Sequence, residues 1–164
     1  MFTGLPIFTG NRNMGNGKEI VKWSDVYHTG IREIDAQHKE LVSLTNELFQ
    51  ACLYGDDVVG VTFRDVMSRM VEYVRFHFTA EMEILTRVNF PNTVEHKKQH
   101  DALIQQILKS AKEFGTGKQY VANNFVRTLK DWILSHIAVY DKEFALYIVE
   151  QKRKGLLSDQ QLDP

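Results

Sequence analysis

The sequence is poor in the residues that would cross-link the chain or anchor it in a membrane. Its 164 residues include a single cysteine, Cys52, so no intrachain disulfide can form, which fits a reducing compartment. No apolar stretch approaches the roughly 18 residues that a membrane span needs. The opening MFTGLPIFTGNR also lacks the basic start and the long apolar core of a secretory signal. We therefore expect a cytoplasmic protein with no membrane partner.

An excess of charge of either sign is missing as well. Lysine and arginine number 20 against 21 aspartates and glutamates, and the net charge is −1. A protein that binds nucleic acid usually presents a basic face, so we expect no nucleic-acid partner. The length and the 43% hydrophobic content are those of one globular domain that can bury a core without disulfides.

Glycine and proline are rare outside the N-terminus. Four of the ten glycines lie in the first 17 residues, so we predict an irregular arm at residues 1–20. The later breakers are Gly30, Gly55, Gly60, Pro91, Gly115, Gly117 and Gly155. They leave four segments of 23 to 37 residues that contain neither residue type, and such segments are too long for strands. The predicted organisation is a helical domain at 21–150 followed by a tail at 151–164.

Hydrophobic periodicity also indicates helices. The first segment carries a stripe with alternating spacings of four and three, and the other three segments carry similar stripes. The stripe of the first segment is Ile34, His38, Leu41, Thr45, Leu48 and Cys52. Four long helices with short connections predict an all-α fold, an antiparallel up-down-up-down four-helix bundle. We expect the fourth segment to end or bend near Tyr140, with a short C-terminal helix from about Lys142 to Lys154.

Five of the six histidines lie in these stripes, at positions that would otherwise hold Leu or Met. A spacing of four places two side chains on one helix face, and two carboxylates accompany the histidines. The set is His38, His77, Glu81, His96, His100, His136 and Asp141. A buried carboxylate without a partner is costly, and a metal ion removes that cost. Each residue taken singly is more readily explained by core packing or a solvated face. Because the four stripes converge on one axis, the set together predicts a site for two metal ions.

Two classes of metal site compete for these residues. The stretch HKKQH has the histidine spacing of zinc proteases, but Lys97 stands where the general-base glutamate is needed, so we discard that interpretation. A single zinc would leave several histidines idle. Helical di-iron oxidases use mostly glutamates, whereas this set is rich in imidazoles, which favours reversible oxygen binding over substrate oxidation. Imidazole and carboxylate ligands suit iron but leave manganese, zinc and cobalt open.

Four stretches, GIREIDAQH, HFTAE, HKKQH and WILSHIAVYD, resemble the hemerythrin domain in its single-domain bacterial form. The opening WSDVYHTGIREIDAQHKEL is similar to the start of that family, W-x-D-x-y-x-x-G-x-x-x-I-D-x-Q-H. The resemblance runs from about Trp23 to Ile148. It implies a four-helix bundle with a non-heme di-iron centre, in which an oxo or hydroxo group also bridges the two iron ions.

The resemblance also implies a role for each ligand. One iron would be held by His96, His100 and His136 and be saturated. The other would be held by His38 and His77 and keep an open position for dioxygen. The carboxylates of Glu81 and Asp141 would bridge the two ions.

Reversible oxygen binding needs a dry pocket that keeps protons and anions out. Helix spacing places five apolar side chains next to the predicted ligands, and simple core packing explains them as well. These residues are Leu41, Phe78, Trp132, Ile133 and Ile137. His28 lies just before Gly30 and outside every stripe, so we predict that it belongs to a surface loop.

The predicted function is that of an oxygen-binding protein, not an enzyme, which stores dioxygen or delivers it to an oxygen-consuming enzyme. Two other functions stay open. The chain could be an oxygen or redox sensor that acts through a partner protein, or a di-iron enzyme that reduces peroxide or nitric oxide. The oligomeric state stays open too.

Overall fold

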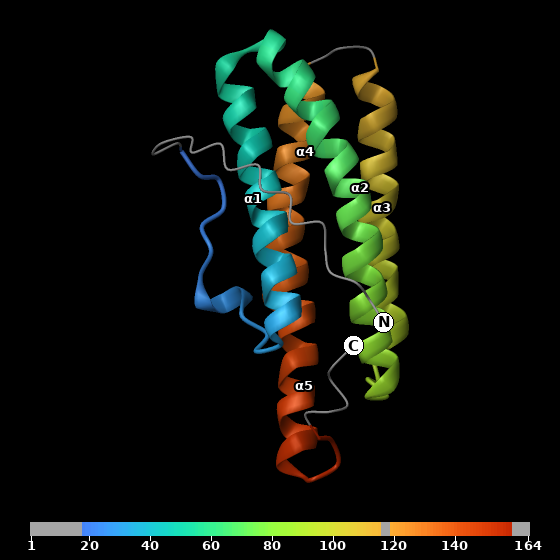
Figure 1. The fold of residues 1–164 in the computed structure, drawn as a ribbon. Helices are drawn as coiled ribbons and strands as arrows, with labels where there is room; N and C mark the ends of the chain where they lie inside the picture. The colour runs from blue at the N-terminus through green and yellow to red at the C-terminus, as the bar shows by residue number, and fades with distance from the viewer. Residues whose placement is uncertain (1–17, 116–118, 159–164) are drawn as a thin grey trace.

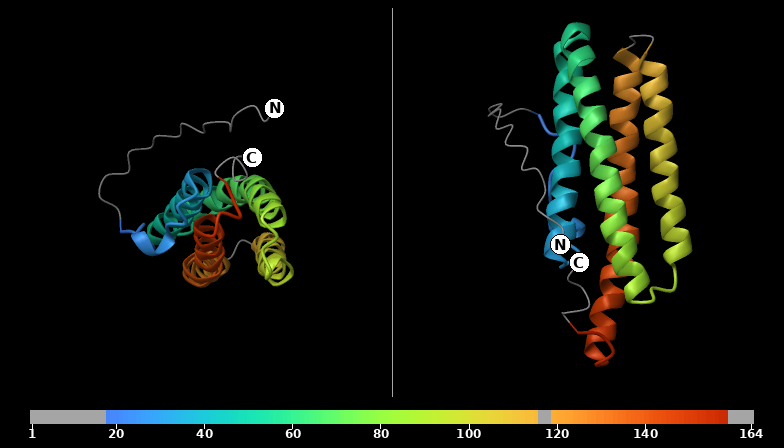
Figure 2. Two further views of the ribbon diagram at one scale, coloured as in Figure 1. Left: turned by 90° about the horizontal axis from the view of Figure 1, so that it is seen from below. Right: turned by 45° about the vertical axis from the view of Figure 1, so that its right-hand side comes forward.

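The structure, a computed structural model, describes residues 18–115 and 119–158. Within those residues every regular element is helical, in the order η1 (Asp25–Tyr27), α1 (Arg32–Tyr54), α2 (Asp56–Arg87), α3 (Thr93–Phe114), α4 (Gln119–Trp132), η2 (Ile133–Asp141) and α5 (Lys142–Arg153). Helices α1 to α4 stand side by side and alternate in direction (Figures 1 and 2). The predicted all-α up-down-up-down bundle is confirmed.

The first two helices form a hairpin around one glycine. Gly55 adopts a φ of 95°, which only glycine tolerates easily, and it separates α1 from α2. Gly60, which we expected to mark a break, instead lies inside α2. Two side-chain contacts define the antiparallel register of the hairpin: the Nδ1 atom of His77 lies 2.8 Å from Oε1 of Gln37, and Arg69 donates to Glu47.

We expected the fourth segment to end or bend near Tyr140, and it does not end there. The short C-terminal helix is present as α5, but α4 continues into it through η2, which is a π-helix. The backbone stays helical at both junctions, with φ and ψ of −66° and −46° at Trp132 and −67° and −41° at Lys142. The result is one long rod whose last part, α5, extends past the end of the bundle (Figure 1).

The core consists of two apolar clusters. The larger one includes Leu41, Met70 and Phe125, and the smaller one consists of Ile34, Ile84, Leu85, Val88, Phe90, Phe144 and Ile148. The smaller cluster joins the start of α1, the end of α2 and α5. A buried polar layer lies between the two clusters.

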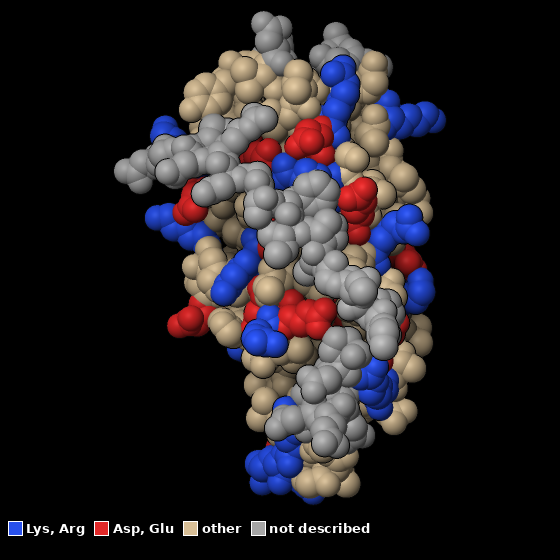
Figure 3. All heavy atoms as spheres, in the orientation of Figure 1, with Lys and Arg blue, Asp and Glu red and all other residues tan. Residues whose placement is uncertain are grey.

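Other features of the chain bear on the expectations from sequence. No helix in residues 18–115 and 119–158 is long and apolar enough to cross a membrane. Lysine and arginine side chains are interspersed with acidic ones on the face shown in Figure 3. Most of the predicted arm, residues 1–17, and the end of the predicted tail, residues 159–164, lie outside the described residues.

Candidate metal centre

The structure brings all seven predicted ligands into one layer across the bundle. Each of them is at most 2% exposed, although every one is polar or charged. Helix α1 contributes His38, α2 contributes His77 and Glu81, α3 contributes His96 and His100, and η2 contributes His136 and Asp141. Within α2 and α3 the spacing of four residues places both side chains on the inward face.

The Glu81 carboxylate lies where three imidazoles converge. Its Oε2 atom is 3.0 Å from Nε2 of His100, 3.1 Å from Nε2 of His96 and 3.8 Å from Nε2 of His77. On the far side of this group, the Nε2 atoms of His100 and His136 face each other at 3.0 Å. Glu81 is therefore in reach of histidines from both ends of the layer.

The Asp141 carboxylate spans the layer in a similar way. Its Oδ1 atom is 3.1 Å from Nε2 of His136 and 3.3 Å from Nε2 of His96, and its Oδ2 atom is 3.1 Å from Nε2 of His38. His136 and Asp141 are five residues apart, a spacing that an α-helix would place on different faces. The π-helical hydrogen bonding of η2 brings residues five apart onto the same face, and such segments are frequent at functional sites.

Ligand atoms from these residues form two groups that could each hold a metal ion. One consists of Glu81, His96, His100 and His136, and the other of His38, His77 and Glu81; within each group the ligand atoms lie within 4.8 Å of one another. Ligands at right angles around an ion, each about 2.1 Å from it, would be about 3.0 Å apart. The observed spacings of 3.0 to 3.3 Å between Nε2 and carboxylate oxygens are close to that value.

The polar groups of the layer are not satisfied by the protein itself. Every ion-pair partner of Glu81 and Asp141 among the described residues is a histidine, so no lysine or arginine offsets the two buried carboxylates. Glu81 Oε1 and His77 Nε2 are buried without a hydrogen-bond partner among the described residues. Such atoms are costly unless a cation is bound, so the donor set fits a metal centre.

Known protein families match most of the chain. The family described as Hemerythrin HHE cation binding domain matches residues 29–147. The chain belongs to this family. A bacteriohemerythrin of Clostridium acetobutylicum is 27% identical over 126 residues, which cover 74% of this chain and 96% of the relative. A hemerythrin-like protein of Naegleria gruberi is 25% identical over 122 residues, with coverage of 74% and 88%. A bacteriohemerythrin of Pseudomonas aeruginosa is 29% identical over 115 residues, with coverage of 70% and 72%.

Burial and the two carboxylates shift the ionisation of this hemerythrin domain. Burial lowers the pKa of His77 to about 3, so its ring is neutral. Burial opposes a charge on His38 too, but the hydrogen bond to Asp141 raises the pKa of that ring. Burial and the charge of Glu81 oppose ionisation of Asp141. The interaction with His136, together with hydrogen bonds that the Asp141 carboxylate accepts from His136 and His38, nevertheless lowers the pKa of Asp141 to about 2. Against burial, neighbouring imidazoles, with His77 first, keep the pKa of Glu81 well below its usual range.

Two residues beside His77 were not predicted from the sequence. Gln37 accepts a hydrogen bond from Nδ1 of His77, which leaves Nε2 of that ring free to face the carboxylates. Tyr73 stacks on the same ring at 5.3 Å between centroids. A signal for Gln37 existed, because it is part of the motif I-D-x-Q-H by which the chain resembles hemerythrins. No pattern in the sequence pointed to Tyr73.

The five apolar residues predicted for a ligand pocket all belong to the larger core cluster or pack against it. Leu41, Ile133 and Ile137 are fully buried. Phe78 stacks on the ring of His100 at 3.7 Å, and Trp132 stacks on that of His136 at 4.2 Å. These two aromatic rings therefore cover histidines of the Glu81, His96, His100 and His136 group.

His28 is exposed and irregular in backbone, as predicted, but it has a partner of its own. Its Nδ1 atom lies 2.8 Å from Oδ2 of the buried Asp35. Asp35 also accepts hydrogen bonds from the Thr29 backbone and hydroxyl and from the Gly30 amide, so it holds the turn that leads into α1. The Asp of the motif I-D-x-Q-H thus has a structural role at the helix start.

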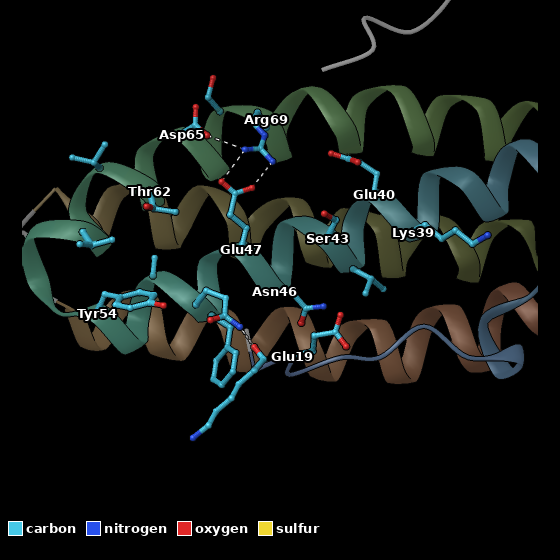
Figure 4. A pocket seen from close by; sticks show the side chains of 18 of the residues that line it. Glu19, Lys39, Glu40, Ser43, Asn46, Glu47, Tyr54, Thr62, Asp65 and Arg69 are labelled. Atoms are coloured by element: carbon cyan, nitrogen blue, oxygen red, sulfur yellow. Dashed lines mark hydrogen bonds and ion pairs between the residues drawn. The ribbon is translucent and has the colours of Figure 1, made fainter. Parts of the chain in front are cut away.

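The candidate metal centre does not open into the large groove on the surface of the bundle. A groove of about 1600 Å³ lies over α1, α2 and the stretch before η1, and none of the seven candidate ligands lines it. Figure 4 shows Arg69 in this groove between Glu47 and Asp65, with which it forms ion pairs. These three charged residues of the groove are thereby paired with one another.

Proposed function

We propose that this hemerythrin domain binds dioxygen reversibly at a non-heme di-iron centre and serves oxygen storage or delivery. The observation that supports it is the buried polar layer, in which five imidazoles and two carboxylates converge and no lysine or arginine among the described residues pairs with the carboxylates. Iron suits ligands of both kinds. Membership of the hemerythrin family supports iron as the metal and dioxygen as the ligand.

In this proposal the two groups of ligands have different tasks. His96, His100 and His136 would hold one iron, and His38 and His77 would hold the other with fewer ligands. Glu81 and Asp141 would each contact both ions, because their oxygens approach histidines of both groups. When bound, two ferrous ions would supply an open coordination position and the two electrons that reversible dioxygen binding needs.

The surrounding apolar residues would keep the centre dry. Leu41, Ile133 and Ile137 are 0% exposed and lie one turn or less from a proposed ligand. Exclusion of water limits the access of protons and anions that would displace a bound ligand.

Metal content and visible absorption, measured in air and after anaerobic reduction, test the proposal. We expect two irons per chain and a colour that bleaches on reduction and returns with oxygen. His77→Ala and Glu81→Ala should each abolish binuclear loading while the helical circular dichroism remains, and His28→Ala, outside the layer, should load fully. Full iron content in both ligand variants, or a single zinc in the wild type, would contradict the proposal.

One contact favours a second candidate, an oxygen or redox sensor that acts through a partner protein. Lys142, the neighbour of Asp141, donates a hydrogen bond to the backbone oxygen of His28 at 2.7 Å. A shift of Asp141 would thus be transmitted through Lys142 to the loop before α1. Limited proteolysis of the oxidised and reduced protein distinguishes the two: a sensor should show different cleavage near His28, and the difference should disappear in Lys142→Met.

A further inference from the structure

Tyr73 carries a buried hydroxyl for which the described residues offer no hydrogen-bond partner. Its side chain is buried on α2. Buried polar groups are nearly always paired, and an unpaired one is destabilising. A phenylalanine would fill the same space without that penalty. An unpaired hydroxyl in such a place therefore points to a ligand.

Tyr73 lies beside His38 and His77, the pair proposed to hold the iron that has fewer ligands. Its ring stacks on that of His77, with an angle of 21° between the planes, and it lies one turn before His77 on α2. Because α1 and α2 are antiparallel, one turn before His77 is level with one turn after His38, where Leu41 lies. Tyr73 and Leu41 thus belong to the same wall, next to the His38 and His77 pair.

The hydroxyl is a donor under ordinary conditions. A tyrosine hydroxyl has an ordinary pKa of about 10, so the phenol carries its proton at neutral pH and can donate it in a hydrogen bond. Of the other residues of the expected pocket, Leu41 and Ile133 offer only hydrocarbon. The indole N–H of Trp132 is also unpaired, but that ring stacks on His136, in the other group of ligands.

We propose that Tyr73 determines which small ligands bind beside His38 and His77, because its hydroxyl donates a hydrogen bond to them. The class of ligand is a small molecule or anion with a terminal atom that accepts a hydrogen bond. This inference rests on the proposed function, since it assumes an open coordination position at that pair. It makes Tyr73 a specificity-determining residue in an otherwise apolar wall.

A second tyrosine provides a matched control. Tyr140 stacks on the ring of His136 at 5.7 Å and 26°, so it resembles Tyr73 in its contact with a proposed ligand. Its hydroxyl is not among the buried groups without a partner. Removal of that hydroxyl should leave ligand binding unchanged.

The test is a titration of the oxidised, iron-loaded full chain with sodium azide, followed by visible absorption. We expect Tyr73→Phe to keep its iron and to bind azide about tenfold more weakly, the effect of one lost hydrogen bond. Tyr140→Phe should bind azide like the wild type. If Tyr73→Phe fails to retain iron, Tyr73→Met replaces it in the same titration.

A thermal unfolding measurement on the metal-free protein completes the test. Because the hydroxyl has no internal partner, metal-free Tyr73→Phe should melt no lower than the wild type. Equal azide affinity in the wild type and Tyr73→Phe, or a lower melting temperature of the metal-free variant, would overturn this inference alone. A wild type that holds no iron would instead overturn the proposed function and this inference with it.

Discussion

Gln37 shows how a single residue outside the ligand set can control a metal ligand. Of the five clustered histidines, His77 is the one whose Nδ1 atom has a hydrogen-bond partner among the described residues, and that partner is Gln37. The contact fixes the ring so that Nε2 faces the carboxylates. Partners of this kind orient a ligand and make it a better base.

Replacement of Gln37 with methionine, which has a similar shape but no amide, should therefore weaken iron binding. We expect a loss of about 10- to 100-fold in affinity, measured by competition with a chelator, and little change in helix content. Gln106→Met, on the half-buried face of α3, is the control and should bind iron normally. An unchanged affinity in Gln37→Met would show that the contact has no part in metal binding.

The pKa shifts predict how the stability of the metal-free protein depends on pH. His77 has a pKa of about 3 when folded and an ordinary value of 6.5, so below pH 6.5 the unfolded chain binds more protons and stability falls. Asp141, at about 2 against 3.8, adds to the loss below pH 3.8. The raised pKa of His38 and of His96 acts in the opposite sense, since their contribution is present below pH 6.5 and is lost above it.

The melting temperature of the metal-free chain should thus be highest near pH 6.5 and fall on both sides. In His77→Leu, which cannot take up this proton, the decline between pH 6.5 and 3 should be shallower than in the wild type. Thermal unfolding across this range, with the metal removed by a chelator, measures both curves. If the melting temperature fell with the same slope between pH 6.5 and 3 in both proteins, His77 would not be the cause of the decline.

Individual residues also differ in how far the sequence predicts their role. The seven polar residues of the layer were visible because imidazoles and carboxylates stand out in an apolar stripe. Tyr73 was not visible, because an aromatic residue on such a stripe looks like ordinary core. Only its depth and its unpaired hydroxyl distinguish it, and both depend on the packing of two helices.

At the scale of elements, η2 is the feature on which the geometry of the layer depends. An α-helix turns about 100° per residue, so residues five apart would point in different directions. The π-helical segment corrects this for His136 and Asp141. The sequence did hold a sign of it, since a spacing of five between two predicted ligands does not suit an α-helix. We instead expected the helix to end or bend there, because periodicity alone cannot distinguish a π-helical segment from a break.

Deletion of Val139, an exposed residue of η2, should convert the segment to α-helix and turn Asp141 away from His136. We expect loss of binuclear iron with retained helical circular dichroism. Val139→Ala keeps the register and should bind iron as the wild type does. Two irons in the deletion variant would show that the π-helix is not needed to align these ligands.

At the scale of the whole molecule, the polar layer divides the core into unequal parts. The smaller cluster includes residues of α5, which extends beyond the bundle and has few other neighbours. Without a cation, the layer contains two buried carboxylates that repel each other. Metal removal should therefore loosen the end of the molecule that includes α5 more than the other end.

Hydrogen exchange with and without metal measures this difference. On chelation we expect amides of α5 to exchange faster by a larger factor than amides near Met70 and Phe125, which belong to the larger cluster. The melting temperature should fall as well, because the ions bind only the folded state. A uniform increase in exchange across all helices would contradict the division into two parts.

The polar layer also bears on how the helices find their alignment. Leucine, isoleucine, valine and methionine in the two clusters are similar enough that apolar contacts alone would tolerate a helix that slides along its neighbours. A slide of one turn, about 5.4 Å, would break contacts that Glu81 or Asp141 makes with imidazoles of neighbouring helices and would move the carboxylate toward hydrocarbon. The layer therefore admits one register of the four helices and disfavours the others, a role known for buried polar groups elsewhere. The same register brings the proposed ligands together, so alignment of the helices and assembly of the proposed site would be one event.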